Sequence, residues 1–134
     1  MFGKDSGKDD CFYSYVNVKG NTTVIAKIAP DTANASGVVG IMAKNDASED
    51  TSMAAGVYYD YDKKQIRAGR HGGASNLVND VTTSVYVKLE FSEGKCYYTI
   101  AKDADFTNII IKRNGMGVDG LDPKTVGFFA TSGN

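Results

Sequence analysis

The sequence is poor in several residue types that mark other classes of protein. Its 134 residues include no tryptophan, one histidine, two cysteines and two prolines. The two cysteines lack the CxxC or Cys/His spacing of a metal or redox site. Fifteen Lys and Arg against sixteen Asp and Glu leave a net charge of −1. The overall charge therefore favours neither nucleic acid nor an anionic membrane as a partner.

Long apolar segments are missing as well. No run approaches the roughly 18 residues of a membrane-spanning helix, and the opening MFGKDSGKDD lacks the pattern of a signal peptide. The length suits one domain with a core of its own. We expect a single soluble domain over residues 1–134, excised from a larger modular enzyme that is secreted, and hence an extracellular location.

What the sequence does contain is strand-forming residues. Tyr, Val, Ile, Thr and Phe crowd into nine runs. These runs are residues 11–18, 22–29, 37–44, 54–61, 65–70, 82–91, 95–102, 108–113 and 125–132. Turn-forming residues separate several of them, and no helical pattern with caps reaches ten residues. The sequence predicts an all-β fold, a two-sheet antiparallel β-sandwich of the jelly-roll type.

Alternation within the runs predicts which side chains are buried. In TTSVYVKLEF, Val85, Val87, Leu89 and Phe91 fall on one face, because side chains alternate across a strand. The same reasoning extends to the other runs. The predicted core between the two sheets includes Val24, Ile41, Val57, Val87, Leu89 and Phe128.

The order of these runs resembles a known family. The chain resembles the concanavalin-A-like (laminarin-G-type) sandwich modules appended to bacterial polysaccharide-degrading enzymes. The resemblance lies in the order of four segments, GVVGIMAKNDASEDTSMAAGVYYDY, IRAGRHGG, VYVKLEFSEGKCYYTIAKDADFTNI and VGFFATSG. Tyr86 stands where that family often has Trp, and Lys44 where it often has Arg. The resemblance implies a lectin-like, non-catalytic carbohydrate-binding module that targets a secreted enzyme, its catalytic domain in cis, to plant cell-wall polysaccharide.

The basic and aromatic residues predict where a glycan binds. Sugar sites combine a ring that stacks on the sugar with polar groups that fix its hydroxyls, and Arg or Lys suits a carboxylated glycan such as pectin. The expected site combines Lys44, Arg67 and Arg70 with Tyr59 and Tyr61. A competing site consists of Lys27, Lys88 and Lys112, which fall on polar strand faces. The alternative is that these tyrosines pack internally and these lysines bind nothing.

Catalysis has little support in the sequence. Glycosidases need two suitably spaced carboxyl groups, and no Glu-x-Asp-x-Glu arrangement is present. Asp60 and Asp62 come closest to such a pair of carboxyl groups. However, Asp62 begins a turn, where aspartate is expected because its side chain hydrogen-bonds the backbone. We therefore expect no enzymatic activity. The alternatives are a small glycan-active enzyme, a glycosidase or lyase, and a structural interaction module in a multidomain enzyme.

Two further features leave alternatives open. The acidic segments NDASED and DSGKDD offer oxygen ligands for a structural calcium ion, without the spacing of a defined calcium loop, so acidic surface loops are the alternative. No other cofactor is expected. Cys11 and Cys96 lie in predicted strands, where they form either one disulfide or two buried thiols.

Overall fold

The computed structural model describes residues 2–3, 11–30, 37–45, 54–70, 73–116 and 121–131. All the regular elements in these ranges are strands. They are β1 (Phe2–Gly3), β2 (Cys11–Asn17), β3 (Thr22–Ile28), β4 (Val38–Lys44), β5 (Ala54–Asp60), β6 (Gln65–Arg70), β7 (Gly73–Val78), β8 (Val85–Ser92), β9 (Lys95–Ala101), β10 (Ile109–Gly115) and β11 (Thr125–Thr131). Within these ranges no helix is long and apolar enough to cross a membrane.

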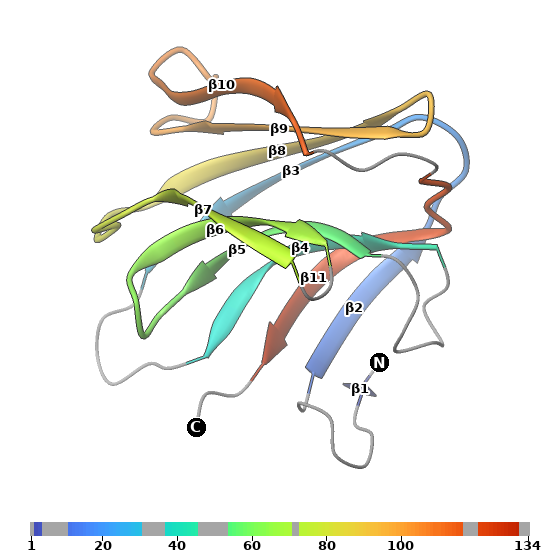
Figure 1. Ribbon diagram of the computed structural model, residues 1–134, viewed down its shortest axis with the longest axis horizontal. Coiled ribbons are helices and arrows are strands. Elements are labelled where there is room, and N and C mark those ends of the chain that lie inside the picture. The colour runs from blue at the N-terminus through green and yellow to red at the C-terminus, as the bar shows by residue number, and fades with distance from the viewer. Residues whose placement is uncertain are drawn as a thin grey trace.

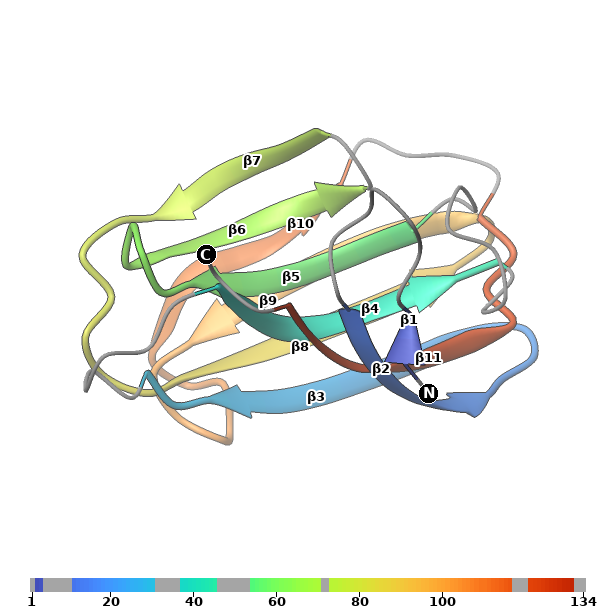
Figure 2. The same cartoon turned by 90° about the horizontal axis from the view of Figure 1, so that it is seen from below.

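The strands form two antiparallel sheets. The large sheet has seven strands in the order β1-β2-β11-β4-β5-β6-β7, and the small sheet has four in the order β10-β9-β8-β3. Figure 1 shows the small sheet stacked above the large one, and Figure 2 shows the large sheet in front of it. The predicted β-sandwich is confirmed.

Sequence patterns identified most of these strands. The nine predicted runs coincide with β2–β6 and β8–β11, except that β8 ends one residue and β10 two residues beyond the predicted runs. The runs missed β7, whose sequence GASNLV has glycine, serine and asparagine where a strand usually has branched or aromatic residues. This segment pairs with β6 through residues such as Ser75 and Asn76, so a neighbouring strand determines its conformation.

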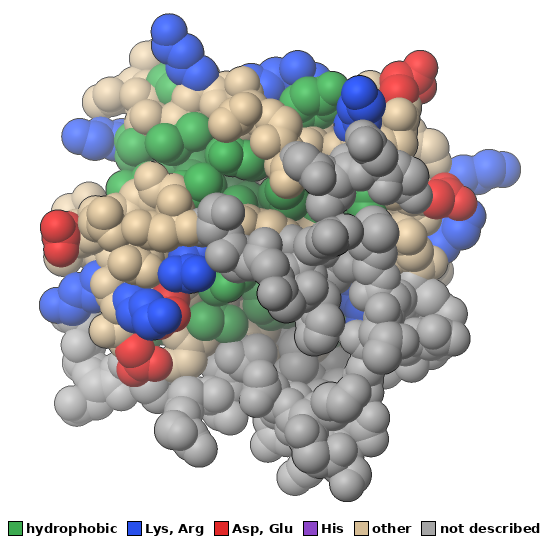
Figure 3. Space-filling view, in the orientation of Figure 1, with side chains coloured by type: hydrophobic (Ala, Val, Ile, Leu, Met, Phe, Trp, Pro, Cys, Tyr) green, Lys and Arg blue, Asp and Glu red, His purple; other side chains and the backbone are tan. Residues whose placement is uncertain are grey.

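The core lies between the two sheets. Ile41 and Val57 from the large sheet and Val87 and Leu89 from the small sheet are at most 1% exposed, as predicted. Val24 is partly buried against this cluster. Hydrophobic side chains are visible between the two sheets on the side of the molecule seen in Figure 3.

Phe128 corrects the predicted core, because its side chain is 56% exposed. It is paired with Ile41, which is buried, so the alternation pattern gave its face correctly. The large sheet has three more strands than the small one, and at about 4.8 Å per strand it overhangs by roughly 14 Å. Val16 on β2 points the same way and is 64% exposed. This part of the inner face lacks a second layer.

Candidate functional site

The outer face of the large sheet, which points away from the small sheet, carries a row of small residues. Register aligns Gly127 with Met42, Met42 with Gly56, and Gly56 with Gly69 across four adjacent strands. Their sequence neighbours Ile41, Val57 and Ala68 point into the core, so these four residues face outward. We call them the glycine row. Three of the four have no side chain; Gly69 and Gly127 are partly exposed, whereas Gly56 is buried.

Two of these glycines are also needed for the strands to approach one another. A Cβ atom added at Gly56 would lie 2.6 Å from the Ile41 carbonyl oxygen and 2.8 Å from the Met42 Cβ. One added at Gly127 would collide with the Ser14 carbonyl oxygen. Glycine within a strand is typical of such close approaches, and of places where a ligand approaches the backbone.

One border of the glycine row is aromatic and polar. Register aligns Phe129, Gly40, Tyr58, Arg67 and Asn76 in the adjacent cross-strand row. The rings of Tyr58 and Phe129 meet edge to face, with centroids 6.0 Å apart.

A chain of amide hydrogen bonds continues this border toward β7. The Arg67 Nη1 donates to Gln65 Oε1 at 3.2 Å, and Gln65 Nε2 donates to Asn79 Oδ1 at 3.0 Å. Asn76 Nδ2 donates to the same Asn79 oxygen at 2.7 Å. These groups are the donors and acceptors that recognise hydroxyls.

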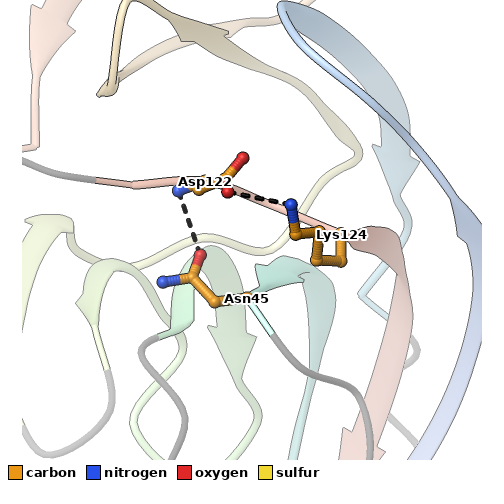
Figure 4. Close-up of polar contacts among 3 residues, drawn as sticks. All are labelled: Asn45, Asp122 and Lys124. Carbon is orange, nitrogen blue, oxygen red and sulfur yellow. Dashed lines mark hydrogen bonds and ion pairs between the residues drawn. The ribbon is translucent and has the colours of Figure 1, made fainter.

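The opposite border contains Lys44, which is aligned with Thr125 on β11. Next to it, the Asn45 Oδ1 accepts a hydrogen bond from the Asp122 backbone N–H at 3.1 Å. The Asp122 carboxylate pairs with the Lys124 Nζ at 2.8 Å (Figure 4). The Lys124 backbone N–H also donates to the Lys44 carbonyl at 3.0 Å. These contacts fix the end of β4, and hence the position of Lys44.

The third side of the site is a pair of stacked rings on β2. Tyr13 and Tyr15 have centroids 5.0 Å apart. Tyr13 is buried, and its hydroxyl lies 2.9 Å from the Thr125 Oγ1. Tyr15 is aligned with Gly127 at the end of the glycine row and is 37% exposed.

The predicted tyrosines require a correction. Tyr59 is 2% exposed and lies in the core, where its hydroxyl donates to the Val81 carbonyl at 2.7 Å. Burial, with the nearby Tyr61 and Asp60, raises the pKa of its phenol. Tyr61 packs against the same core and meets Tyr59 edge to face. Tyr58, the residue before Tyr59 on the same strand, is the ring that faces outward.

The predicted basic residues are divided between the two sheets. Lys44 and Arg67 share the outer face of the large sheet, on opposite borders of the glycine row and about 16 Å apart by strand geometry. The side chain of Arg70 lies outside the described part of the chain. Lys27 and Lys88 belong to β3 and β8 of the small sheet, and the exposed Lys112 to its edge strand β10.

The side chains of two aspartates accept hydrogen bonds from residues of nearby turns. The Asp60 Oδ1 accepts hydrogen bonds from the backbone N–H groups of Asp62 and Lys63 at 3.0 and 3.2 Å. Asp103 accepts hydrogen bonds from the Thr107 hydroxyl and the Asn108 backbone N–H. These bonds lower the pKa of the Asp103 carboxyl. Both carboxylates organise turns, as the sequence suggested for Asp60 and Asp62.

The calcium hypothesis falls outside what the structure describes. The acidic segments at 5–10 and 46–50 are not among the described residues, and the described ones contain no group of three or more metal-ligating side chains.

Of the two cysteines, the side chain of Cys11 lies outside the described part of the chain. Cys96 is a free thiol in the core. Burial, with a smaller contribution from Glu90, raises its pKa to about 12.

Sequence reasoning missed the glycine row. Gly56, Gly69 and Gly127 each interrupt a strand pattern, a signal that marks a bulge or a close backbone approach. Their alignment depends on the register of strands that are distant in sequence, which the pattern within each strand does not contain.

Comparisons with known proteins define the fold but no family. No protein-family model matches the chain, and no curated protein matches it. Among solved structures, the chain is similar to scytalido-glutamic peptidase, crystallised with a transition state analog inhibitor, with a TM-score of 0.58 and 11% identity. The match covers 92% of this chain and 65% of the peptidase chain.

This likeness contradicts the expectation that the chain is not an enzyme. The sequence argument treated a sandwich without an acidic glucanase motif as non-catalytic, whereas a structural neighbour of this chain is a peptidase. Fold alone does not determine function, since one architecture supports several chemistries. At 11% identity, the comparison shows that the chain is a two-sheet β-sandwich like that of the peptidase.

Proposed function

We propose that this chain binds polysaccharide across the outer face of the large sheet, as a module that holds a secreted glycan-degrading enzyme on plant cell-wall material. The observation that carries the proposal is the glycine row, bordered by Tyr58 and Phe129. A sugar ring has an apolar face that stacks on aromatic side chains. Gly69 and Gly127, the partly exposed glycines of the row, would let a polymer approach the sheet beside these rings.

The dimensions of this face suit a chain of several sugars. From β11 to β7 the aligned residues span four strand intervals, about 19 Å. The Arg67–Gln65–Asn79–Asn76 chain of hydrogen bonds lies at one end of that span. These polar groups would fix hydroxyls while the rings hold the sugar plane.

The two cations on this face support an acidic glycan such as pectin. Arg67 and Lys44 border the glycine row from opposite sides. A guanidinium matches a carboxylate with two parallel hydrogen bonds, so Arg67 is the better candidate for a uronate group.

A second candidate is hydrolysis on the same face. The observation that favours it is the likeness to a peptidase. The acidic groups near this face among the described residues include Asp60, which accepts hydrogen bonds from its own turn, and Asp122, which pairs with Lys124.

Calorimetry on a panel of plant glycans tests the proposal, with released reducing ends and cleaved peptides measured in parallel. We expect Tyr58→Ala to weaken glycan binding about 3–10-fold, the usual contribution of an aromatic contact. Phe128→Ala is the matched control, because it removes an exposed ring from the opposite face of the same sheet. Equal binding by both variants, or no binding to any glycan, would contradict the proposal. Turnover lost on Asp60→Asn would favour the second candidate.

A further inference from the structure

The outer face of the small sheet pairs positive charges with aromatic rings. The Lys88 Nζ lies 4.6 Å from the centroid of the Phe106 ring, and the Lys27 Nζ lies 6.0 Å from that of Tyr86. The third pair is Arg113 and Tyr97, in which the guanidinium carbon lies 3.8 Å from the ring centroid. Each pair takes its cation and its ring from different segments of the chain.

These pairs lie on one surface. Register aligns Lys27 with Tyr86 and Lys88 with Ile25 on β3 and β8. Glu90, two residues from Lys88, pairs with Arg113 at 3.1 Å. Ile25 is 54% exposed between the two lysines. We call this surface the cation–aromatic face.

The charge of this layer differs from that of the rest of the chain. Residues 19–30 and 82–116, which contain the small sheet, hold seven Lys and Arg and four Asp and Glu, a net charge of +3. The remainder holds the other eight basic and twelve acidic residues, a net charge of −4. An overall charge of −1 therefore conceals a positive layer. Figure 3 shows Lys and Arg side chains around the upper part of the molecule, where the small sheet lies.

A cation held over a ring has a fixed position before a ligand arrives. Cation–π contact restrains a flexible lysine, so less side-chain entropy is lost when an anion binds. The rings and Ile25 add apolar surface on which a sugar ring can stack. A surface with these two properties suits a polymer that is both carboxylated and partly apolar.

We propose that the cation–aromatic face is a second binding surface, independent of the large-sheet site, that takes an acidic polysaccharide chain. Charge complementarity identifies the occupant, because the face presents Lys27, Lys88 and Arg113 against the single carboxylate of Glu90 among its described residues. Nucleic-acid binding depends on neutralising many phosphates, often about 6–10. A net excess of two charges on this face suits the sparser carboxylates of a uronic-acid polymer better.

Binding of polygalacturonate and of its fully methyl-esterified form tests this proposal, because esterification removes the charge and keeps the backbone. The test variant is Lys27→Gln with Lys88→Gln. The control is Lys63→Gln with Lys64→Gln, two exposed lysines in the β5–β6 turn. At low salt we expect the test variant to bind polygalacturonate ~5–10-fold more weakly than the control, the effect of removing two exposed charge pairs. The dependence of binding on salt should also fall.

The outcomes separate this proposal from the large-sheet site. Tyr58→Ala combined with Arg67→Gln should leave the difference between the lysine variants intact. If Tyr58→Ala combined with Arg67→Gln binds every glycan as tightly as the parent, the large-sheet proposal fails, while the comparison of the lysine variants on polygalacturonate still decides this one. Equal affinity of the two lysine variants, equal binding of the esterified polymer, or no binding of polygalacturonate would overturn it. Tighter binding of single-stranded oligothymidylate than of polygalacturonate would identify a different occupant and also overturn it.

Discussion

The two outer faces of the sandwich use similar residue types in opposite ways. On the large sheet, Arg67 and Lys44 lie on either side of a row that is nearly without side chains. On the small sheet, Lys27 and Lys88 lie over rings of the same face. The first arrangement offers ring edges and the backbone at Gly69 and Gly127, and the second offers an array of positioned charges. Two surfaces of one small domain can therefore differ in whether shape or charge governs binding.

The inner faces differ as well. At the centre of the small sheet, Val87 and Leu89 are fully buried. The large sheet is covered over β4 and β5 but not at Val16 and Phe128, which are exposed on β2 and β11. The same kind of residue therefore contributes differently to stability in the two sheets.

The largest expected effect tests this difference in coverage. Leu89→Ala should lower the free energy of unfolding by about 2–5 kcal/mol, because it leaves a cavity among buried side chains. Phe128→Ala should lower it by less than about 1 kcal/mol, since a surface side chain contributes little. Denaturant unfolding of both variants measures the two values. If Phe128→Ala lowered the free energy of unfolding as much as Leu89→Ala does, the overhang would have to be covered in solution.

A smaller effect tests the close approach of strands in the large sheet. Gly56→Ala should cost about 1–3 kcal/mol, because its Cβ would meet backbone and Cβ atoms of β4. Gly115→Ala on β10 is the matched control, since its Cβ would lie 3.8 Å from the Tyr97 ring, an ordinary contact. We expect the control to change stability by no more than about 0.5 kcal/mol. Equal unfolding midpoints for the two variants would show that the strands are more widely spaced than described.

The smallest effect concerns the β9–β10 turn of the small sheet and depends on pH. The lowered pKa of Asp103 means that its hydrogen bonds stabilise the folded state above about pH 3.9, the value for an unfolded aspartate. This stabilisation is lost as the pH falls through the lower folded value. Asp103→Asn should therefore be less stable than the parent at pH 7, and the difference in free energy of unfolding should be smaller at pH 2.5. Urea unfolding of both proteins at the two pH values measures this difference. Asp105→Asn in the same turn is the control, and a gap that stays constant with pH would assign the effect to shape rather than charge.

The proposed glycan sites illustrate why residue patterns predict faces better than functions. Alternation placed Tyr58 and Tyr59 on opposite faces of one strand, and this is correct. It did not say which face was covered, and the expected ligand-binding ring, Tyr59, is the buried one. The two competing groups of basic residues lie on different sheets, Lys44 and Arg67 on the large one and Lys27, Lys88 and Lys112 on the small one. The sequence alone could not assign them, because residues on strands far apart in sequence meet only through the topology.

The sequence by itself determined the strands and the inward or outward direction of most side chains, because β-propensity and two-residue alternation are local properties of the chain. The tertiary structure decided which inward side chains are covered and which outward ones are neighbours. Phe128 points inward yet is exposed, while Val126 on the same face of the same strand is buried, because the cover over the large sheet ends along β11. Gly127, Met42, Gly56 and Gly69 form one row because the register of four strands aligns them. Coverage and register are properties of pairs of strands and of whole sheets, so no single segment of the sequence contains them.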